Sequence, residues 1–120
     1  MSKKILIVDD SLFTFEEMKS MLSGTDYEAS AHAKNGEEAF KMYAQLMPDI
    51  VTMDIILPGL SGLETSKLIL GKWKDAKIVI VSSLAYDDTI NKAAELGINN
   101  FIFKPFEKEE LIKALDDVSK

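Results

Sequence analysis

The sequence predicts an α/β protein in which a doubly wound parallel sheet of five strands alternates with five helices. Four short apolar runs, rich in β-branched and aromatic residues and with little polar alternation, are typical of strands buried on both faces of a parallel sheet. Segments of helix length, with apolar residues spaced about 3.6 apart, separate these runs. Strands and helices that alternate along a chain form βα units with right-handed crossovers, which gives an open α/β sheet.

The expected elements follow one another in order along the chain. The four apolar runs are Ile5–Val8, Ile50–Met53, Ile78–Val81 and Phe101–Phe103, and a weaker strand with alternating character is expected in Tyr27–Ala33. The helices are marked in turn by Met18, Met21 and Leu22; by Ala39, Phe40, Tyr43 and Leu46; by Leu63 and Leu70; by Ile90, Ala93, Ala94 and Leu96; and by Leu111, Ile112 and Leu115. Turn-forming residues at Asn35–Gly36, Pro48, Pro58–Gly59, Gly71 and Gly97 separate the elements.

Length and composition indicate one globular domain, which we place at residues 1–120. The chain is 47% apolar and 28% charged, as globular proteins are. Its longest apolar runs are far shorter than the roughly 20 residues of a membrane span, so no membrane association is expected. The absence of cysteine excludes disulfides and thiolate metal sites. A net charge of −6 without a basic cluster argues against nucleic-acid binding.

Polar residues follow four of the predicted strands. These residues are Asp9 and Asp10 after the first strand, Asp54 after the third, Ser82 and Ser83 after the fourth, and Lys104 after the fifth. Because binding sites in open α/β sheets lie outside the carboxyl ends of the strands, we expect these side chains to converge at one edge. Three neighbouring carboxylates repel one another, and a lysine and a hard divalent cation such as Mg²⁺ relieve this repulsion.

An aspartate in such a site can act as a nucleophile toward phosphorus and form an aspartyl phosphate. The chain has no nucleotide-binding glycine motif, so the phosphoryl group is expected to come from another molecule rather than from bound ATP. Ile56 stands where aspartyl-phosphate hydrolases carry a second acid, which argues against that class. The alternative is that Asp10 only caps the first helix and Asp54 only shapes a turn. His32, the single histidine, is interpreted as an ordinary residue near the second strand rather than a ligand.

Four motifs resemble the receiver domain of bacterial response regulators, in particular the stand-alone chemotaxis type. They are Ile5–Ser11 (ILIVDDS), Pro48–Asp54 (PDIVTMD), Leu57–Gly62 (LPGLSG) and Phe103–Phe106 (FKPF). The resemblance runs in register from Lys3 to about Val118. It implies a flavodoxin-like sheet with strand order 2-1-3-4-5.

The resemblance also implies roles for single residues. By it, Asp54 is the phospho-acceptor, Asp10 is a direct Mg²⁺ ligand, and Asp9 acts on the metal largely through water. The main-chain carbonyl of Ile56 would complete the protein's share of the coordination. Lys104 would contact the phosphoryl group, and the peptide bond that follows it would be cis.

The same resemblance predicts a switch. Ser82 would supply its hydroxyl and Phe101 its coupled aromatic ring, and the fourth helix, fifth strand and fifth helix would form the output surface. Two alternatives are open for Phe13: an exposed anchor for the kinase, or packing against Pro105–Phe106. Apolar side chains at Ile56 and Leu84 predict slow loss of the phosphate, measurable as decay of the phosphorylated protein.

We therefore expect a cytoplasmic, monomeric signalling protein rather than an enzyme, which takes a phosphoryl group from a histidine kinase. No segment follows the fifth predicted helix, so output is expected to occur by contact with a protein, such as a flagellar motor component. A phosphorelay intermediate that passes phosphate between histidines, and an interaction module that no longer switches, are the alternatives. An intact set of Asp10, Asp54 and Lys104 argues against the last.

Overall fold

The computed structural model describes residues 2–83 and 87–120. The strands are β1 (Lys3–Val8), β2 (Tyr27–Ala33), β3 (Ile50–Asp54), β4 (Ile78–Ser82) and β5 (Phe101–Phe103). The helices are α1 (Leu12–Leu22), α2 (Gly36–Leu46), α3 (Gly62–Lys72), α4 (Asp87–Glu95) and α5 (Lys108–Val118). The strands pair in parallel in the order β2-β1-β3-β4-β5, which confirms the predicted fold class and strand order. In this part of the chain no helix has the length and apolarity needed to cross a bilayer.

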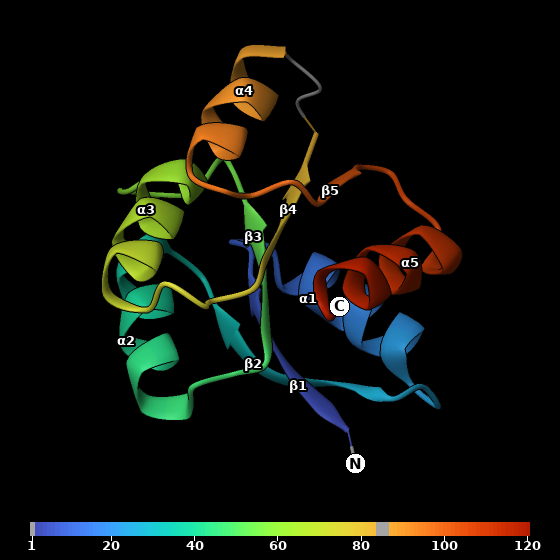
Figure 1. Ribbon diagram of the computed structural model, residues 1–120. Coiled ribbons are helices and arrows are strands. Elements are labelled where there is room, and N and C mark those ends of the chain that lie inside the picture. The colour runs from blue at the N-terminus through green and yellow to red at the C-terminus, as the bar shows by residue number, and fades with distance from the viewer. Residues whose placement is uncertain (1, 84–86) are drawn as a thin grey trace.

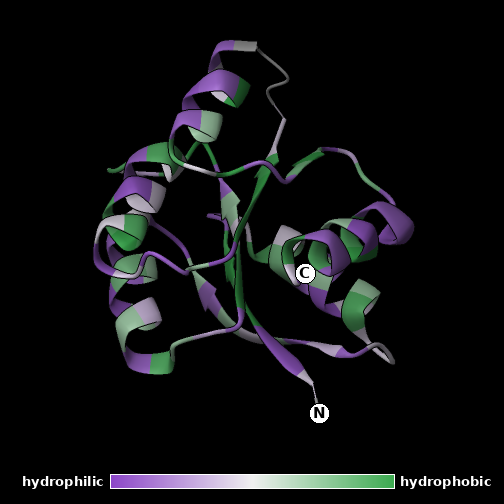
Figure 2. Cartoon of the chain, viewed as in Figure 1, coloured by the Kyte–Doolittle hydropathy of each residue, from purple (hydrophilic) through white to green (hydrophobic). Residues whose placement is uncertain are grey.

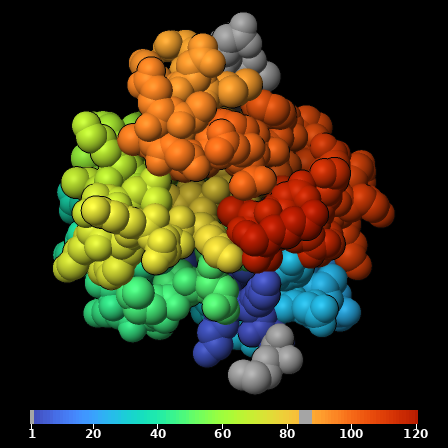
Figure 3. Space-filling model, in the orientation of Figure 1, coloured from blue at the N-terminus to red at the C-terminus, as the bar shows by residue number. Residues whose placement is uncertain are grey.

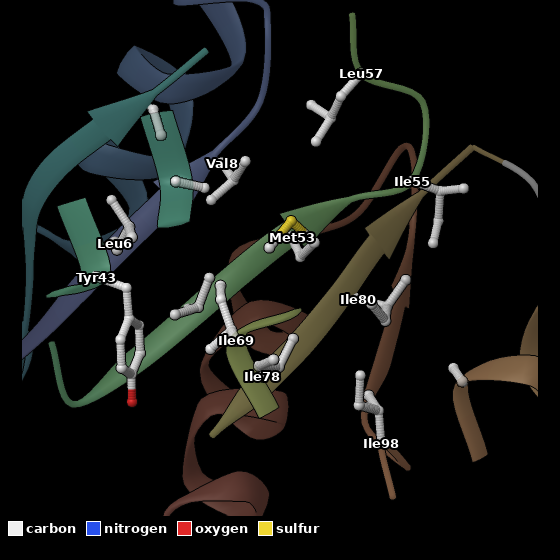
Figure 4. Close-up of a cluster of buried hydrophobic side chains, with 14 residues drawn as sticks. Leu6, Val8, Tyr43, Met53, Ile55, Leu57, Ile69, Ile78, Ile80 and Ile98 are labelled. Carbon is white, nitrogen blue, oxygen red and sulfur yellow. The ribbon is translucent and has the colours of Figure 1, made fainter. Parts of the chain in front are cut away.

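Helices cover both faces of the sheet (Figure 1). On one face, α2, α3 and α4 pack over alternate residues of the strands, in a cluster that includes Leu6, Met53 and Ile80 (Figure 4). On the other face, α1 and α5 pack over the residues in between, such as Ile7 and Val79. The central strands are hydrophobic along most of their length (Figure 2), as the uninterrupted apolar runs predict.

The N-termini of α1, α2 and α3 are capped by short polar side chains. The hydroxyl of Ser11 accepts a hydrogen bond from the N–H of Thr14, and the amide oxygen of Asn35 accepts one from the N–H of Glu38. Such caps satisfy N–H groups that have no partner within the helix. The cap of α1 is therefore Ser11 and not Asp10, so the alternative in which Asp10 serves only as a cap is wrong.

The expected apolar stripes differ from the structure in two details. Leu46, expected on the buried face of the second helix, is half exposed, because α2 ends there and the chain turns away at Met47. Leu96 lies one residue beyond α4, at the turn where Gly97 adopts a φ of 89°. The expected turn at Gly71 is also wrong, because this residue lies inside α3 rather than after it.

Gly62, the first residue of α3, allows that helix to start close to the end of β3. A Cβ atom at Gly62 would lie 1.9 Å from the carbonyl oxygen of Asp54. The N–H of Gly62 donates to the carbonyl of Ile55 at 2.8 Å, which closes the intervening loop. The backbone on the carboxyl side of Asp54 is thus fixed by a contact that only glycine permits.

Candidate functional site

Three carboxylates meet at the carboxyl edge of the sheet. Asp9 and Asp10 follow β1, Asp54 ends β3, and the two strands are neighbours paired through Val8 and Met53. One oxygen from each carboxylate lies within 4.8 Å of the others. The convergence expected from the sequence is therefore present in the structure.

Lys104 enters this cluster from the end of β5. Its Nζ donates to Oδ2 of Asp9 at 2.8 Å and to Oδ2 of Asp54 at 2.9 Å. Its backbone N–H donates to the carbonyl of Ser82 at 2.8 Å, which ties the lysine to the end of β4. The Lys104–Pro105 peptide bond is cis, as the resemblance implied.

The cluster shifts the protonation equilibria of its members. Burial raises the pKa of the Asp54 carboxyl, and the charge of Asp9 adds to this rise, while Lys104 partly offsets it. Burial alone would lower the pKa of the Lys104 ammonium, but the hydrogen bonds and charges of Asp9 and Asp54 outweigh burial and raise it. The ammonium of Lys104 is therefore firmly charged and offsets part of the repulsion between the carboxylates.

The carboxylates of Asp9 and Asp10 have different surroundings. Asp9 is 2% exposed, and both of its oxygens are bound: Oδ1 accepts from the N–H of Ser11 at 2.9 Å and Oδ2 from Lys104. Asp10 is exposed, and across residues 2–83 and 87–120 no group donates a hydrogen bond to its carboxylate. An all-oxygen set with one free carboxylate suits Mg²⁺, which takes few protein ligands and keeps several waters.

The loop after Asp54 borders the cluster. The N–H of Ile56 donates to Oδ1 of Asp54 at 3.3 Å, so the backbone of Ile56 lies beside the carboxylates. The Ile56 side chain lies at the surface, where it is 59% exposed. Leu84, the other residue expected to limit access of water, lies outside the described residues.

Ser82 and Phe101 lie on β4 and β5, and Ser82 is the nearer of the two to the cluster, because Phe101 pairs with Ile80. Ser82 is buried at the end of β4, one residue beyond Val81, which pairs with Asp54. Phe101 is half-buried and packs against the α4 side of the core. Its ring stacks on that of Phe103, with centroids 6.4 Å apart and planes 5° from parallel.

His32, on β2, is not a member of the carboxylate cluster but contacts the backbone of Asp9, which the sequence pattern did not indicate. Its Nε2 lies 2.7 Å from the backbone carbonyl oxygen of Asp9. The ring of Phe15, on α1, stacks on the His32 ring with centroids 4.6 Å apart. The pairing register of β2 with β1, and the position of α1 over that pair, bring these residues to Asp9, and neither is visible in the sequence pattern.

Phe13 is 75% exposed at the start of α1. This exposure favours the alternative in which it is an exposed anchor over the one in which it packs against Pro105–Phe106. Leu12, beside it, is also exposed. The first turn of α1 therefore places apolar surface next to the acidic cluster.

Comparison with known proteins gives a consistent result. The model of the response regulator receiver domain matches residues 5–116. The chain is 38% identical to the chemotaxis protein CheY of Thermotoga maritima over 120 residues, covering 100% of both chains. It is also 38% identical to the chemotaxis protein CheY of Listeria monocytogenes over 117 residues, covering 98% of each.

Solved structures agree with these relatives. The CheX–CheY–BeF₃–Mg complex of Borrelia burgdorferi matches with a TM-score of 0.92 and 28% identity, over 97% of this chain and 88% of that one. The response regulator domain of Thermotoga maritima CheB matches with a TM-score of 0.88 and 32% identity, over 100% and 98%. The chain therefore belongs to the response regulator receiver domain family of two-component signalling systems.

Proposed function

We propose that Asp54 accepts a phosphoryl group from the phosphohistidine of a histidine kinase, and that residues 1–120 act as one receiver domain. The observation that supports this most is the convergence of Asp54 with Asp9 and Asp10 around the ammonium of Lys104. In such a site Asp54 supplies the nucleophile and the other carboxylates can hold a cation. Lys104 supplies positive charge for the phosphoryl oxygens.

In the transfer step, a carboxylate oxygen of Asp54 attacks phosphorus in line with the bond to the kinase imidazole. The O–P bond forms as the P–N bond breaks, and the electron pair of the broken bond stays on the departing nitrogen. The other ring nitrogen of the phosphohistidine carries a proton, so the imidazole leaves in its neutral form. Lys104 is positioned to contact an equatorial phosphoryl oxygen, because its Nζ already contacts the Asp54 carboxylate. The backbone N–H of Ile56 keeps that carboxylate oriented.

The cluster fits a divalent cation such as Mg²⁺. Asp10 and Asp54 would supply carboxylate oxygens, the carbonyl of Ile56 a further ligand, and Asp9 would act through water because Ser11 and Lys104 already bind its oxygens. When bound, the cation supplies positive charge that neutralises the carboxylates and the phosphoryl oxygens.

The phosphorylated state would be read on the surface formed by α4, β5 and α5. These elements lie side by side on the face shown in Figure 3. In this proposal the Ser82 hydroxyl moves to a phosphoryl oxygen and Phe101 reorients with it. Because Phe101 is half-buried on the α4 side of the core, its reorientation would alter the surface next to α4.

The output is proposed to be docking on a protein of the chemotaxis or flagellar motor system, in the cytoplasm, by a monomeric receiver. The relatives named as chemotaxis proteins support this over a phosphorelay role. The exposed Phe13, with Leu12, is proposed as the apolar contact for the kinase. This places the phosphodonor beside Asp54 when the two proteins meet.

Incubation with a small phosphodonor and Mg²⁺ tests the chemistry. One base-labile phosphate is expected on Asp54, detected by mass spectrometry, and Asp54→Asn is expected to abolish it. The matched control is Asp26→Asn, which removes an exposed carboxylate at the opposite end of the sheet and is expected to leave the rate unchanged. Phosphate found on Ser11, Ser82 or Ser83 instead would overturn the assignment.

A further inference from the structure

Two residues at the end of β2 contact the backbone of Asp9, one at its N–H and one at its carbonyl. The N–H of Asp9 donates to the carbonyl of Ala33 at 3.0 Å, and the carbonyl of Asp9 lies 2.7 Å from Nε2 of His32. Because β1 ends at Val8, this carbonyl lies past the last residue of the strand ladder. A side chain, rather than the sheet, supplies its partner.

The direction of this hydrogen bond follows from the two groups. A carbonyl oxygen can only accept, so the His32 nitrogen that faces it carries the proton. The ring is held in that orientation by Phe15, whose plane lies 8° from parallel to it at stacking distance. The imidazole therefore has a fixed position and a defined donor.

The Asp9 carbonyl belongs to the same planar peptide unit as the N–H of Asp10. Fixing that oxygen fixes the rotation of the unit, and with it the direction in which the chain enters Asp10. Asp10 is the exposed carboxylate of the cluster, with no hydrogen bond from another described group to orient it. The position of the Asp10 carboxylate therefore depends mainly on its backbone. The Asp9 side chain, by contrast, is buried and is held by its own hydrogen bonds.

We propose that His32 is a positioning residue for the cation site. Its N–H···O contact to Asp9 orients the Asp9–Asp10 peptide so that the Asp10 carboxylate faces Asp54. This inference rests on the proposed Mg²⁺ site. Groups that hydrogen-bond directly to metal ligands typically change metal affinity by about 10- to 100-fold when they are removed. Because His32 acts one peptide unit away from the ligand, we expect a loss near the lower end, about tenfold.

Three substitutions separate the hydrogen bond from packing. His32→Phe keeps a flat ring for Phe15 to stack on and removes the N–H donor, and His32→Leu removes both the donor and the ring. His32→Gln places an amide N–H where Nε2 stood and gives up the stack. The matched control is Ser30→Ala, because Ser30 on the same strand donates to the carbonyl of Ile5 at 3.2 Å, far from the site.

The measurements are the Mg²⁺ dissociation constant by titration calorimetry and the Tm in EDTA. We expect His32→Phe and His32→Leu to weaken Mg²⁺ binding about tenfold, and His32→Gln and Ser30→Ala to bind within about threefold of wild type. A purely structural role would lower the metal-free Tm and leave the affinity of the folded protein unchanged. Wild-type affinity in His32→Phe or His32→Leu, or equal weakening in His32→Gln, would overturn the inference. Failure of the wild type to bind Mg²⁺ would instead remove the metal from the proposed function.

Discussion

The two ends of the sheet treat charge in opposite ways. At the carboxyl end, the carboxylates of Asp9, Asp10 and Asp54 converge around one ammonium. At the amino end, polar groups meet complementary partners: the hydroxyl of Tyr27 donates to the Asp116 carboxylate, and the N–H of Lys4 donates to that of Asp49 at 2.6 Å. Polar groups at the amino end of the sheet thus have complementary partners, whereas like charges lie close together at the carboxyl end.

The difference shows where the chain retains unfavourable interactions. Like charges held together raise the free energy of the folded state. The pKa of Asp54 is raised mainly by burial, Lys104 offsets part of the rise, and the charge of Asp9 adds to it. A bound divalent cation would relieve this repulsion, so part of its cost would be recovered as cation-binding free energy. At the amino end no such relief is needed, and the contacts there only stabilise the fold.

The largest expected effect on stability and phosphorylation distinguishes a substitution at the start of α3 from one near its end. Gly62→Ala, at the start of α3, places a Cβ 1.9 Å from the Asp54 carbonyl oxygen, so the backbone beside the phospho-acceptor must shift. We expect a loss of about 2 kcal/mol in the free energy of unfolding, typical of overpacking, together with slower phosphorylation. Urea unfolding and the phosphodonor assay measure the two effects.

Gly71→Ala, at the other end of α3, is the matched control. Among residues 2–83 and 87–120, no atom outside its own stretch of helix lies within 4 Å of the added Cβ, and the residue is helical. The substitution is therefore expected to stabilise by about 0.5 kcal/mol and to leave phosphorylation unchanged. Equal effects of the two substitutions on phosphorylation would show that the contact between Gly62 and Asp54 does not matter to the site.

An effect of intermediate size on stability should differ in sign between substitutions at the two ends of the sheet. Asp54→Asn removes one of the converging charges while Lys104 keeps its hydrogen bond to Asp9, so in EDTA at pH 7 the Tm is expected to rise. Tyr27→Phe removes the donor to Asp116 and is expected to cost about 1 kcal/mol. A lower Tm for Asp54→Asn would mean that its pairing with Lys104 outweighs the repulsion.

The amino-acid sequence was sufficient to predict the strands and the convergence of charge. Parallel strands buried on both faces leave apolar runs that are easy to recognise, and their carboxyl ends share an edge, so the residue pattern alone places Asp54 and Lys104 together. The family resemblance adds the strand order and the cis peptide after Lys104.

The contact of His32 with Asp9 could not be predicted, because it depends on register. The pairing of β1 with β2 shifts in register between Ile5 and Leu6, and this irregularity places His32 opposite Ile7. From there the His32 ring reaches the backbone carbonyl of Asp9. Alternating patterns identify a strand but not which residues of two strands face each other. The exposure of Phe13 likewise depends on how α1 lies over the sheet, which apolar spacing alone leaves open.

The smallest expected effect lies at the N-terminus of α3, where Glu64 and Ser61 form a reciprocal capping box. The backbone N–H of Ser61 donates to the Glu64 carboxylate at 3.0 Å and holds its pKa below the usual 4.5. A pKa lowered on folding gives stability that is present above the unfolded value and is lost as pH falls through the folded value. Glu64→Gln keeps the box at every pH, so the stability of the wild type relative to this variant should decline below about pH 4.5. Glu109→Gln, in the first turn of α5 but outside that helix's capping box, is the control and should give a flatter difference in urea unfolding. The same slope for both variants would assign the effect to any carboxylate near a helix start, and not to the box beside the phospho-acceptor loop.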